Sequence, residues 1–436
     1  MSEAFLIRGA SLEGGAAADI LLADGVIAEV GTGLSRAGAT VVDGAGLVAL
    51  PGLVDLHTHL REPGYEASET ILTGSQAGAA GGYSALFAMP NTSPVADTAG
   101  VVEQELALGD AAGYVTVQPI GAVTVGQKGE RLAEIGAMAQ SRARVRVYSD
   151  DGFCVWDPLI MRRALEYVKA FDGVIAQHAQ DPRLTEGAQM NEGRVSAELG
   201  LAGWPAVAEE AIIARDVLLA EHVGSRLHVC HLSTAGSVDI VRWAKKRGIA
   251  VTAEVTPHHL LLTEELVRDY DARFKVNPPL RRDEDVNAVR EGLADGTIDI
   301  VATDHAPHPA EAKACEWHAA ANGMVGLESA LRVVQQAVVE TGMLDWADVA
   351  RVMSRTPAAI GRLTGHGRPL AAGEPAHLTL HDPAGGGVFG IADLAGRSTN
   401  SPYLGRELPG RTRWTFHGGR ATWRDGVLAP PAEVAP

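Results

Sequence analysis

The sequence has few cysteines, no long apolar run and no excess of positive charge. Its three cysteines, Cys154, Cys230 and Cys315, fit neither a disulfide framework nor the spacing of a zinc knuckle. A chain without disulfides suits a reducing compartment, so we expect a cytoplasmic protein. The formal net charge of −17 argues against nucleic acid or an anionic membrane as the main partner.

The absence of long apolar runs further limits the class of protein. No stretch of about 18 uncharged apolar residues occurs, which excludes a transmembrane helix of ordinary length. The first residues, MSEAFLIRGASLEGG, lack a basic segment followed by an apolar one, so we do not expect a secretory signal. What is present is a chain of 436 residues with 46% hydrophobic side chains, enough for a large core.

The two ends of the chain share a strand-rich pattern. Short alternating strands are predicted at residues 5–12, 19–30, 39–50, 376–382 and 411–428. Gly418 and Gly419 predict a hairpin turn inside the last of these segments. Because neither end can bury a sheet alone, we expect both ends to pair into one small β-sandwich lobe.

Between the ends, buried strands alternate with helices. Strands are predicted at residues 84–89, 115–119, 145–149, 174–178, 227–231, 250–254 and 298–303. Helices are predicted between them, for example at residues 159–170 and 206–221. This α/β alternation predicts a parallel sheet closed into a (β/α)₈ TIM barrel. We predict a barrel over residues 51–365, and a lobe built from residues 1–50 and 366–436, tail included.

Polar residues recur where the predicted barrel strands end, which is where barrels carry their chemistry. His57 and His59 lie two residues apart, so both side chains point to one side of a strand. Asp151, His178 and His231 follow three further strands, and Asp304 follows the last. One histidine at a strand end is usually a packing residue, but this recurrence favours a metal centre. Four imidazoles exceed what one catalytic zinc needs, so a bridging carboxylate and two ions are expected.

Two polar neighbours of these residues receive a different interpretation. Asp150 lies one residue from Asp151, and His228 alternates to the opposite face from His231. We expect both to be packing residues or to support the metal ligands from behind.

Seven segments give the sequence a family likeness. PGLVDLHTHLREPG, MPNTSPVADT, SDDG, CHLSTAGSV, EVTPHHLLLT, KVNPPLR and VATDHAPH occur in this order across roughly residues 50 to 330. Together they resemble the class I dihydroorotases, the long bacterial type in the cyclic amidohydrolase superfamily. The resemblance implies reversible, zinc-dependent cyclisation of N-carbamoyl-L-aspartate to L-dihydroorotate in pyrimidine biosynthesis.

The resemblance also implies a role for each metal ligand. His57 and His59 would bind the first zinc ion, and His178 and His231 the second. Asp151 would bridge the two ions together with a hydroxide, which would be the nucleophile. The strand before it reads RVRVYSDDG and has no lysine, so no carboxylated lysine is expected.

The remaining implied roles concern proton transfer and the substrate. Asp304 would ligate the first ion and act as general base and acid. The implied substrate-binding residues are Arg61, Asn91, Asn277, His308, Asn322 and Gly323. Asn322 stands where the family often has an aromatic residue, so the resemblance implies a main-chain contact there in place of ring packing. The resemblance further implies a homodimer and leaves an association with aspartate transcarbamoylase open.

Arg61 bears on the choice of substrate. A guanidinium can hold a carboxylate through two parallel hydrogen bonds, and with Asn91 it would grip the carboxylate of dihydroorotate. A dihydropyrimidinase, hydantoinase or allantoinase would share the metal ligands but has no such carboxylate to hold. An inactive scaffold partner of aspartate transcarbamoylase is the other alternative, and the filled ligand positions argue against it.

Overall fold

The small lobe is a single hydrogen-bonded sheet built from both ends of the chain. The computed structural model describes residues 3–430. The sheet has nine strands, in the order β21-β20-β19-β16-β5-β1-β2-β3, and β4 pairs with β1 off this path. The strands are β1 (Phe5–Leu12), β2 (Ala17–Ala23), β3 (Val26–Gly31), β4 (Thr40–Asp43), β5 (Val48–Pro51), β16 (Leu378–Asp382), β19 (Arg411–His417), β20 (Arg420–Arg424) and β21 (Val427–Leu428).

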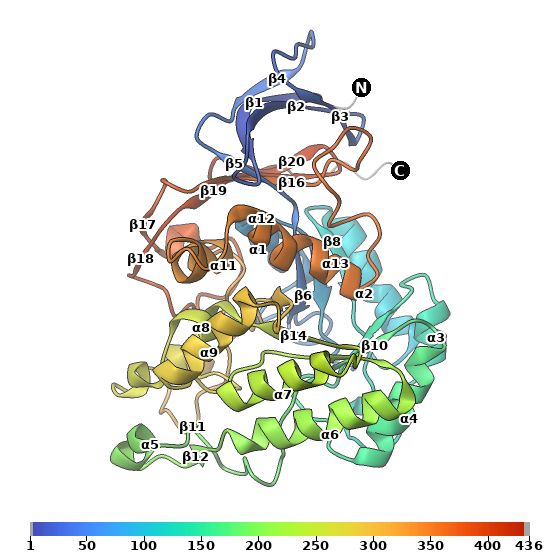
Figure 1. The fold of residues 1–436 in the computed structure, drawn as a ribbon, viewed down its shortest axis with the longest axis vertical. Coiled ribbons are helices and arrows are strands. Elements are labelled where there is room, and N and C mark those ends of the chain that lie inside the picture. The colour runs from blue at the N-terminus through green and yellow to red at the C-terminus, as the bar shows by residue number, and fades with distance from the viewer. Residues whose placement is uncertain (1–2, 431–436) are drawn as a thin grey trace.

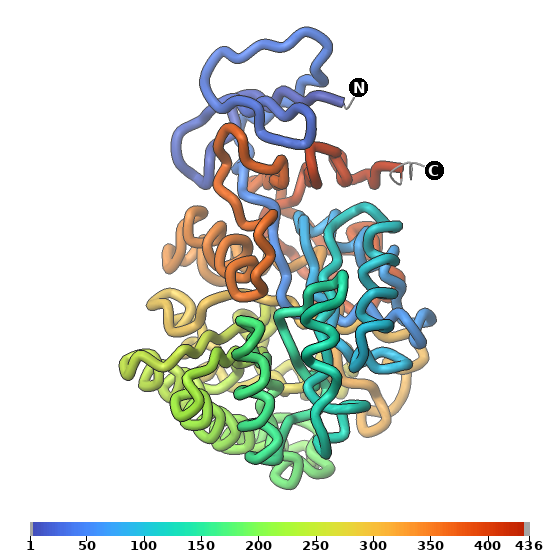
Figure 2. The backbone as a smooth tube through the Cα atoms, turned by 90° about the vertical axis from the view of Figure 1, so that its right-hand side faces the viewer, coloured from blue at the N-terminus to red at the C-terminus, as the bar shows by residue number. Residues whose placement is uncertain are grey.

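The lobe sheet is folded over its own apolar core. Phe5, Ile20, Ala49, Leu378 and Phe416 pack in one buried cluster, so both chain ends contribute to the same core. Figures 1 and 2 show the N-terminal and C-terminal strands stacked at one end of the molecule, beyond the barrel. The expected pairing of the two ends is therefore present.

The expected hairpin turn is also present, between β19 and β20. Gly418 and Gly419 have φ angles of 57° and 78°, which is the left-handed backbone that a two-residue hairpin requires. The predicted frayed tail, residues 428–436, begins too early: Leu428 belongs to β21, and Ala429 is buried and donates to the carbonyl of Thr422 at 3.0 Å. Residues 431–436 fall outside the described part of the chain.

The barrel is assembled from a three-stranded and a five-stranded parallel sheet. Their orders are β6-β7-β8 and β15-β14-β13-β10-β9. A bridge between Gly121 and Tyr148 joins β8 to β9, and one between Thr58 and His305 joins the last strand to the first. The strands are β6 (Leu53–Thr58), β7 (Tyr83–Ala88), β8 (Thr116–Pro119), β9 (Val147–Tyr148), β10 (Val174–Gln177), β13 (Arg226–Val229), β14 (Val251–Val255) and β15 (Ile300–Val301).

Helices surround these strands and bury them. The longer helices are α1 (Ile71–Gly81), α2 (Ala99–Ala112), α4 (Pro158–Lys169), α6 (Val207–Val223), α7 (Ala235–Lys246) and α9 (Asp283–Ala294). The shorter ones are α3 (Ile135–Gln140), α5 (Arg194–Leu199), α8 (Pro257–Leu261), α10 (Ala310–Lys313), α11 (Ala330–Val334), α12 (Trp346–Ala350) and α13 (Thr356–Ile360). Two short pairs lie outside the barrel: β11 (Met190–Asn191) with β12 (Gly203–Trp204), and β17 (Gly387–Val388) with β18 (Glu407–Leu408).

Local sequence explains where the predicted helices begin and end. Asp157 caps α4 by accepting hydrogen bonds from the amides of Leu159 and Ile160, and Pro158 occupies the first helical position. Helix α6 ends at Gly224 in the left-handed conformation. Among residues 3–430, no helix is both long and apolar enough to cross a membrane.

Candidate functional site

Five barrel strands bring their polar ends together on one face of the barrel. His57 lies in β6 and His59 follows it, while Asp151, His178, His231 and Asp304 follow β9, β10, β13 and β15. All six side chains are buried, with exposed fractions of at most 5%. The structure thus places the six residues that the sequence analysis singled out in one cluster.

Asp151 lies at the centre, and its two carboxylate oxygens face different histidine pairs. Its Oδ2 lies 3.4 Å from His57 Nε2 and 3.3 Å from His59 Nε2. Its Oδ1 lies 3.2 Å from both His178 Nδ1 and His231 Nε2. Burial opposes ionisation, but the neighbouring imidazoles hold the pKa of Asp151 well below its usual range. A carboxylate shared in this way is suited to bridge two cations.

The carboxylate of Asp304 lies close to the pair His57 and His59 only. Its Oδ1 lies 3.4 Å from His57 Nε2 and 3.1 Å from His59 Nε2. Two ligand sets result, one of His57, His59, Asp151 and Asp304, and one of Asp151, His178 and His231.

The hydrogen bonds behind the rings fix which nitrogens face the centre. His57 Nδ1 lies 2.5 Å from Glu254 Oε1, and His59 Nδ1 lies 2.9 Å from Asn91 Oδ1. His178 Nε2 lies 2.7 Å from Gln180 Oε1. When each of these nitrogens donates its proton outward, the other nitrogen turns a lone pair toward the carboxylates.

That arrangement fits bound cations. His57 Nε2 is buried without a hydrogen-bond partner. His178 Nδ1 and His231 Nε2 lie 2.8 Å apart and both face Asp151. Lone pairs that face each other and a carboxylate repel unless a positive charge lies between them. Imidazole and carboxylate ligands of this kind suit zinc and related divalent ions.

Glu254, at the end of β14, is a supporting residue that the sequence analysis missed. Its Oε1 contacts His57 Nδ1 and accepts a hydrogen bond from the amide of His231 at 3.1 Å. Its Oε2 lies 3.0 Å from His228 Nε2, so His228 supports the site through this carboxylate. Burial raises the pKa of Glu254, but His57 and His228 outweigh it and keep the carboxylate ionised. The available signal was an acid at the end of a predicted strand.

Asp150 and Asp55 hold the backbone around the ligands. Asp150 accepts hydrogen bonds from the amides of Val123 and Thr124, at 2.8 and 3.0 Å. Asp55 accepts from the amides of His57 and Thr303, which ties the first barrel strand to the last. Burial raises the pKa of each of these two carboxyls to about 6.

Three site residues adopt the left-handed backbone that non-glycine residues rarely use. The φ angles of Arg61, His231 and Asp304 are 65°, 30° and 48°. Such strained conformations gather at functional sites, where the surrounding structure enforces them. Here they turn the chain sharply after a strand.

A cavity of about 290 Å³ adjoins the ligands. All the predicted substrate-binding residues line it, namely Arg61, Asn91, Asn277, His308, Asn322 and Gly323. Burial lowers the pKa of Arg61 to about 10, against the opposing charges of Asp304 and Asp151, so its guanidinium stays positive at neutral pH. It is a local positive charge in an acidic protein, as an anionic ligand would need.

Another part of the cavity wall, at His308, is neutral. Burial, and then the charge of Arg61, lower the pKa of His308 to about 3, and its Nε2 donates to the carbonyl of Asn322 at 2.7 Å. A side chain at Gly323 would meet Ala306 at 2.7 Å, so only glycine fits there. The Gly323 amide already donates to the carbonyl of Lys275 at 2.9 Å.

Comparison with known proteins decides the family. The family model described as Dihydro-orotase-like matches residues 46–237. A dihydroorotase of Leifsonia xyli subsp. xyli is 75% identical over 426 residues, covering 98% of this chain and 97% of that protein. The chain belongs to the dihydroorotase family. A dihydroorotase of Mycobacterium tuberculosis is 54% identical over 425 residues, covering 97% of this chain and 99% of that protein.

Solved structures support the fold of this dihydroorotase family member. An L-hydantoinase from Arthrobacter aurescens superposes with a TM-score of 0.87 at 23% identity, covering 99% of this chain and 98% of that one. A dihydropyrimidinase from Brevibacillus agri gives 0.83 at 20% identity, covering 98% and 96%. At these identities the likeness concerns the fold alone. The predicted barrel with its lobe of strands is confirmed, as is the family predicted from the motifs.

Proposed function

We propose that the chain is a dihydroorotase that interconverts N-carbamoyl-L-aspartate and L-dihydroorotate. The observation that carries the proposal is the pair of ligand sets sharing Asp151, beside a cavity in which Arg61 is positive. Family membership at 75% identity supports the same reaction. The inactive-scaffold alternative is not favoured, because all the predicted ligand positions are filled and clustered.

Two zinc ions would be held by the residues whose lone pairs face Asp151. His57, His59 and Asp304 would hold one ion, His178 and His231 the other, and Asp151 both. When bound, such ions lower the pKa of water from about 15.7 to near 7 and polarise a carbonyl group. Glu254 would keep two of these ligands, His57 and His231, in place.

Asp304 would move the proton in both directions of the reaction. Burial opposes ionisation, but His57 and His59 keep the pKa of Asp304 below its usual value, so the group is a carboxylate. In ring opening it would accept the proton of the attacking hydroxide and deliver it to the ring nitrogen as the amide bond breaks. In cyclisation it would take that proton from the carbamoyl nitrogen.

The cavity walls would select a carboxylated substrate. Arg61 would hold the carboxylate through its guanidinium fork. His59 Nδ1 contacts Asn91 Oδ1. The NH₂ group of Asn91 would therefore be the part that donates to the substrate carboxylate, beside Arg61. Asn277 Oδ1 is buried without a partner and would accept a hydrogen bond from a substrate N–H. The neutral His308 would close the pocket without repelling Arg61.

The domain limits at residues 50 and 365, a homodimer and an association with aspartate transcarbamoylase stay predictions, as does a cytoplasmic location.

A substrate panel tests the proposed function. Purified protein should turn over dihydroorotate in preference to dihydrouracil, hydantoin and allantoin. Zinc-edge anomalous scattering should place two ions beside the substrate cavity, one on each side of Asp151. A preference for dihydrouracil would overturn the substrate assignment, and a single ion would overturn the bridging role.

A further inference from the structure

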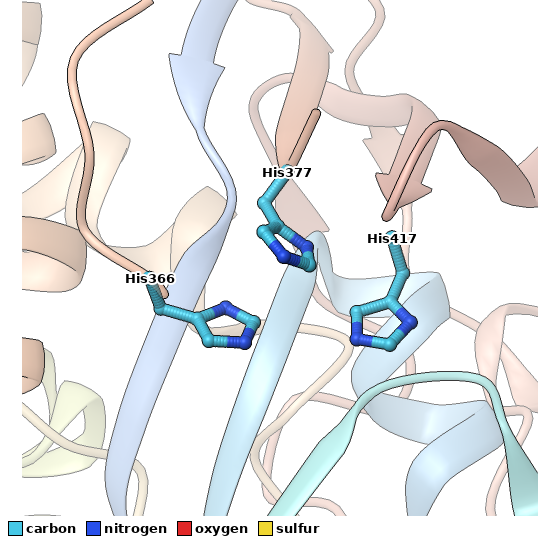
Figure 3. Close-up of side chains that lie close together, drawn as sticks. All are labelled: His366, His377 and His417. Atoms are coloured by element: carbon cyan, nitrogen blue, oxygen red, sulfur yellow. The ribbon is translucent and has the colours of Figure 1, made fainter. Parts of the chain in front are cut away.

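A second group of histidines lies between the barrel and the lobe. His366 follows α13 of the barrel, His377 precedes β16 of the lobe, and His417 ends β19. Their rings surround one space and come from three separate segments (Figure 3). One nitrogen from each ring can be chosen so that the three lie within 4.8 Å of one another. The ligands of the candidate metal centre lie elsewhere, at the carboxyl ends of the barrel strands.

The spacing of these rings resembles that of the site already described. The ring centroids of His366, His377 and His417 are separated by 4.1, 4.8 and 6.0 Å. In the candidate metal centre, His57 and His59 are 5.4 Å apart, and His178 and His231 are 4.6 Å apart. Zinc–nitrogen bonds of about 2.0–2.1 Å in tetrahedral geometry place ring centroids about 5 Å apart. Small side-chain shifts would therefore bring the three rings onto one ion.

Two hydroxyl groups contact His366, one at each ring nitrogen. Ser84 Oγ donates to the carbonyl of Leu53 at 3.3 Å, so it accepts from His366 Nδ1 at 2.9 Å. That hydrogen bond places the proton on Nδ1 and leaves a lone pair on Nε2. Thr116 Oγ1 lies 3.0 Å from this Nε2 and 3.1 Å from His417 Nε2. The hydroxyl of Thr116 has one proton, so it can donate to only one of these two Nε2 atoms if both carry lone pairs.

The three rings are in the form that binds metal. Burial lowers the pKa of His377 to about 4 and, with His377 and Arg420, that of His417 to about 3. It also lowers the pKa of His366 well below the usual value. Neutral imidazoles are ligands for zinc, copper and nickel, whereas protonated ones are not.

We propose that His366, His377 and His417 form a further metal site, which takes a divalent transition ion, Zn²⁺ first, and joins the barrel to the lobe. His366 is buried, while His377 and His417 are half-buried, so solvent can supply a fourth ligand. The amide of Gly418 donates to His377 Nδ1 at 3.2 Å. Binding through Nε2 moves the proton to Nδ1 and breaks this bond, which is exposed and replaceable by water.

The place of the site determines its role. It lies near Ser84 and Thr116, at the ends of β7 and β8 where these strands enter the barrel. In TIM barrels this face serves stability, and the opposite face serves chemistry. The ion would therefore be structural, and its loss should not change the turnover of dihydroorotate.

The test counts zinc in matched variants. Wild-type protein, His377→Ala and His417→Ala are loaded with Zn²⁺, freed of excess by gel filtration and analysed by mass spectrometry. Each variant should carry one zinc fewer per chain than the wild type. His222→Ala, which removes an exposed histidine in the last turn of α6, should carry the wild-type number. Because the count is a difference, it stands whether or not the proposed catalytic centre holds two ions.

Two measurements keep the outcome decisive. Circular dichroism establishes that the variants are folded, and zinc-edge anomalous scattering from wild-type crystals should give a peak among the three rings. Equal zinc content in the wild type and both variants, or no such peak in wild-type crystals, would show a hydrogen-bonded histidine cluster only and overturn the proposal.

Discussion

Glu254 offers the sharpest test of how the metal centre is built. It touches no substrate-cavity residue in the proposed mechanism, yet it accepts hydrogen bonds at 2.5 Å from His57 Nδ1, at 3.0 Å from His228 Nε2 and at 3.1 Å from the His231 amide. In Glu254→Gln one carboxylate oxygen becomes an amide NH₂. That group cannot accept from a ring N–H, so His57 or His228 must change its tautomer.

The expected effect follows from that change. If His57 moves its proton to Nε2, it no longer presents a lone pair to the ion. Losing such a supporting carboxylate typically weakens metal binding by about 10- to 100-fold, or about 1.4 to 2.7 kcal/mol. We expect a zinc dissociation constant raised by that factor, and turnover that is partly restored by excess Zn²⁺.

The assay is competition with a zinc-binding dye, followed by turnover at increasing free Zn²⁺. Glu105→Gln is the matched control, because Glu105 is also fully buried but contacts Thr92 rather than a ligand. Burial raises the pKa of Glu105 well above its usual value. Unchanged zinc affinity in a folded Glu254→Gln protein would refute the supporting role.

The remaining predictions concern proton transfer, substrate binding and stability. Asp304→Ala should abolish turnover and leave the fold intact by circular dichroism. The control Asp239→Ala, on the exposed face of α7, should keep both the turnover and the fold of the wild type. Substantial activity without Asp304 would contradict its role. Arg61→Met should weaken dihydroorotate binding by about 2–4 kcal/mol, seen as a raised KM, and Arg61→Lys should fall in between; an unchanged KM would remove Arg61 from the pocket. Burial lowers the pKa of His381 to about 3, so between that pH and about 6.5 the folded state binds one proton fewer than the unfolded state. The free energy of unfolding should therefore fall as pH falls through this window. In urea titrations, His381→Gln should reduce this pH dependence by about 1.4 kcal/mol per pH unit. A wild-type free energy of unfolding that does not change with pH in this window would contradict the prediction.

Predictions from the sequence were accurate where the spacing of the residues and their chemical type both indicate the local structure. His57 and His59 could be assigned to one face because strand side chains alternate, and the helix predicted at residues 159–170 differs from α4 (Pro158–Lys169) by one residue at each end. Strand limits were less accurate: residues 298–303 were expected, but the strand covers only Ile300–Val301, although Asp299 and Ala302 on either side still donate to the carbonyls of Ala253 and Val255. In a run that is buried on both faces, hydrophobicity does not reveal which residues make hydrogen bonds.

Long-range contacts could not be read from the sequence. Glu254 was hidden because its importance depends on three groups from two other strands, His57, His228 and the His231 backbone. His228 was expected to pack or to support the ligands, and its contact with Glu254 was not foreseen. The histidines between barrel and lobe were not singled out at all, because they come from segments with no shared motif.

The joint origin of the lobe has a consequence for the protein during its synthesis. Strand β5 pairs with β16, about 330 residues later in the chain. At about 5–20 residues per second, the partner leaves the ribosome some 15 to 65 seconds after Val48–Pro51. For that time the nascent N-terminal strands present an unpaired edge, which a chaperone can cover and which a second nascent chain can join.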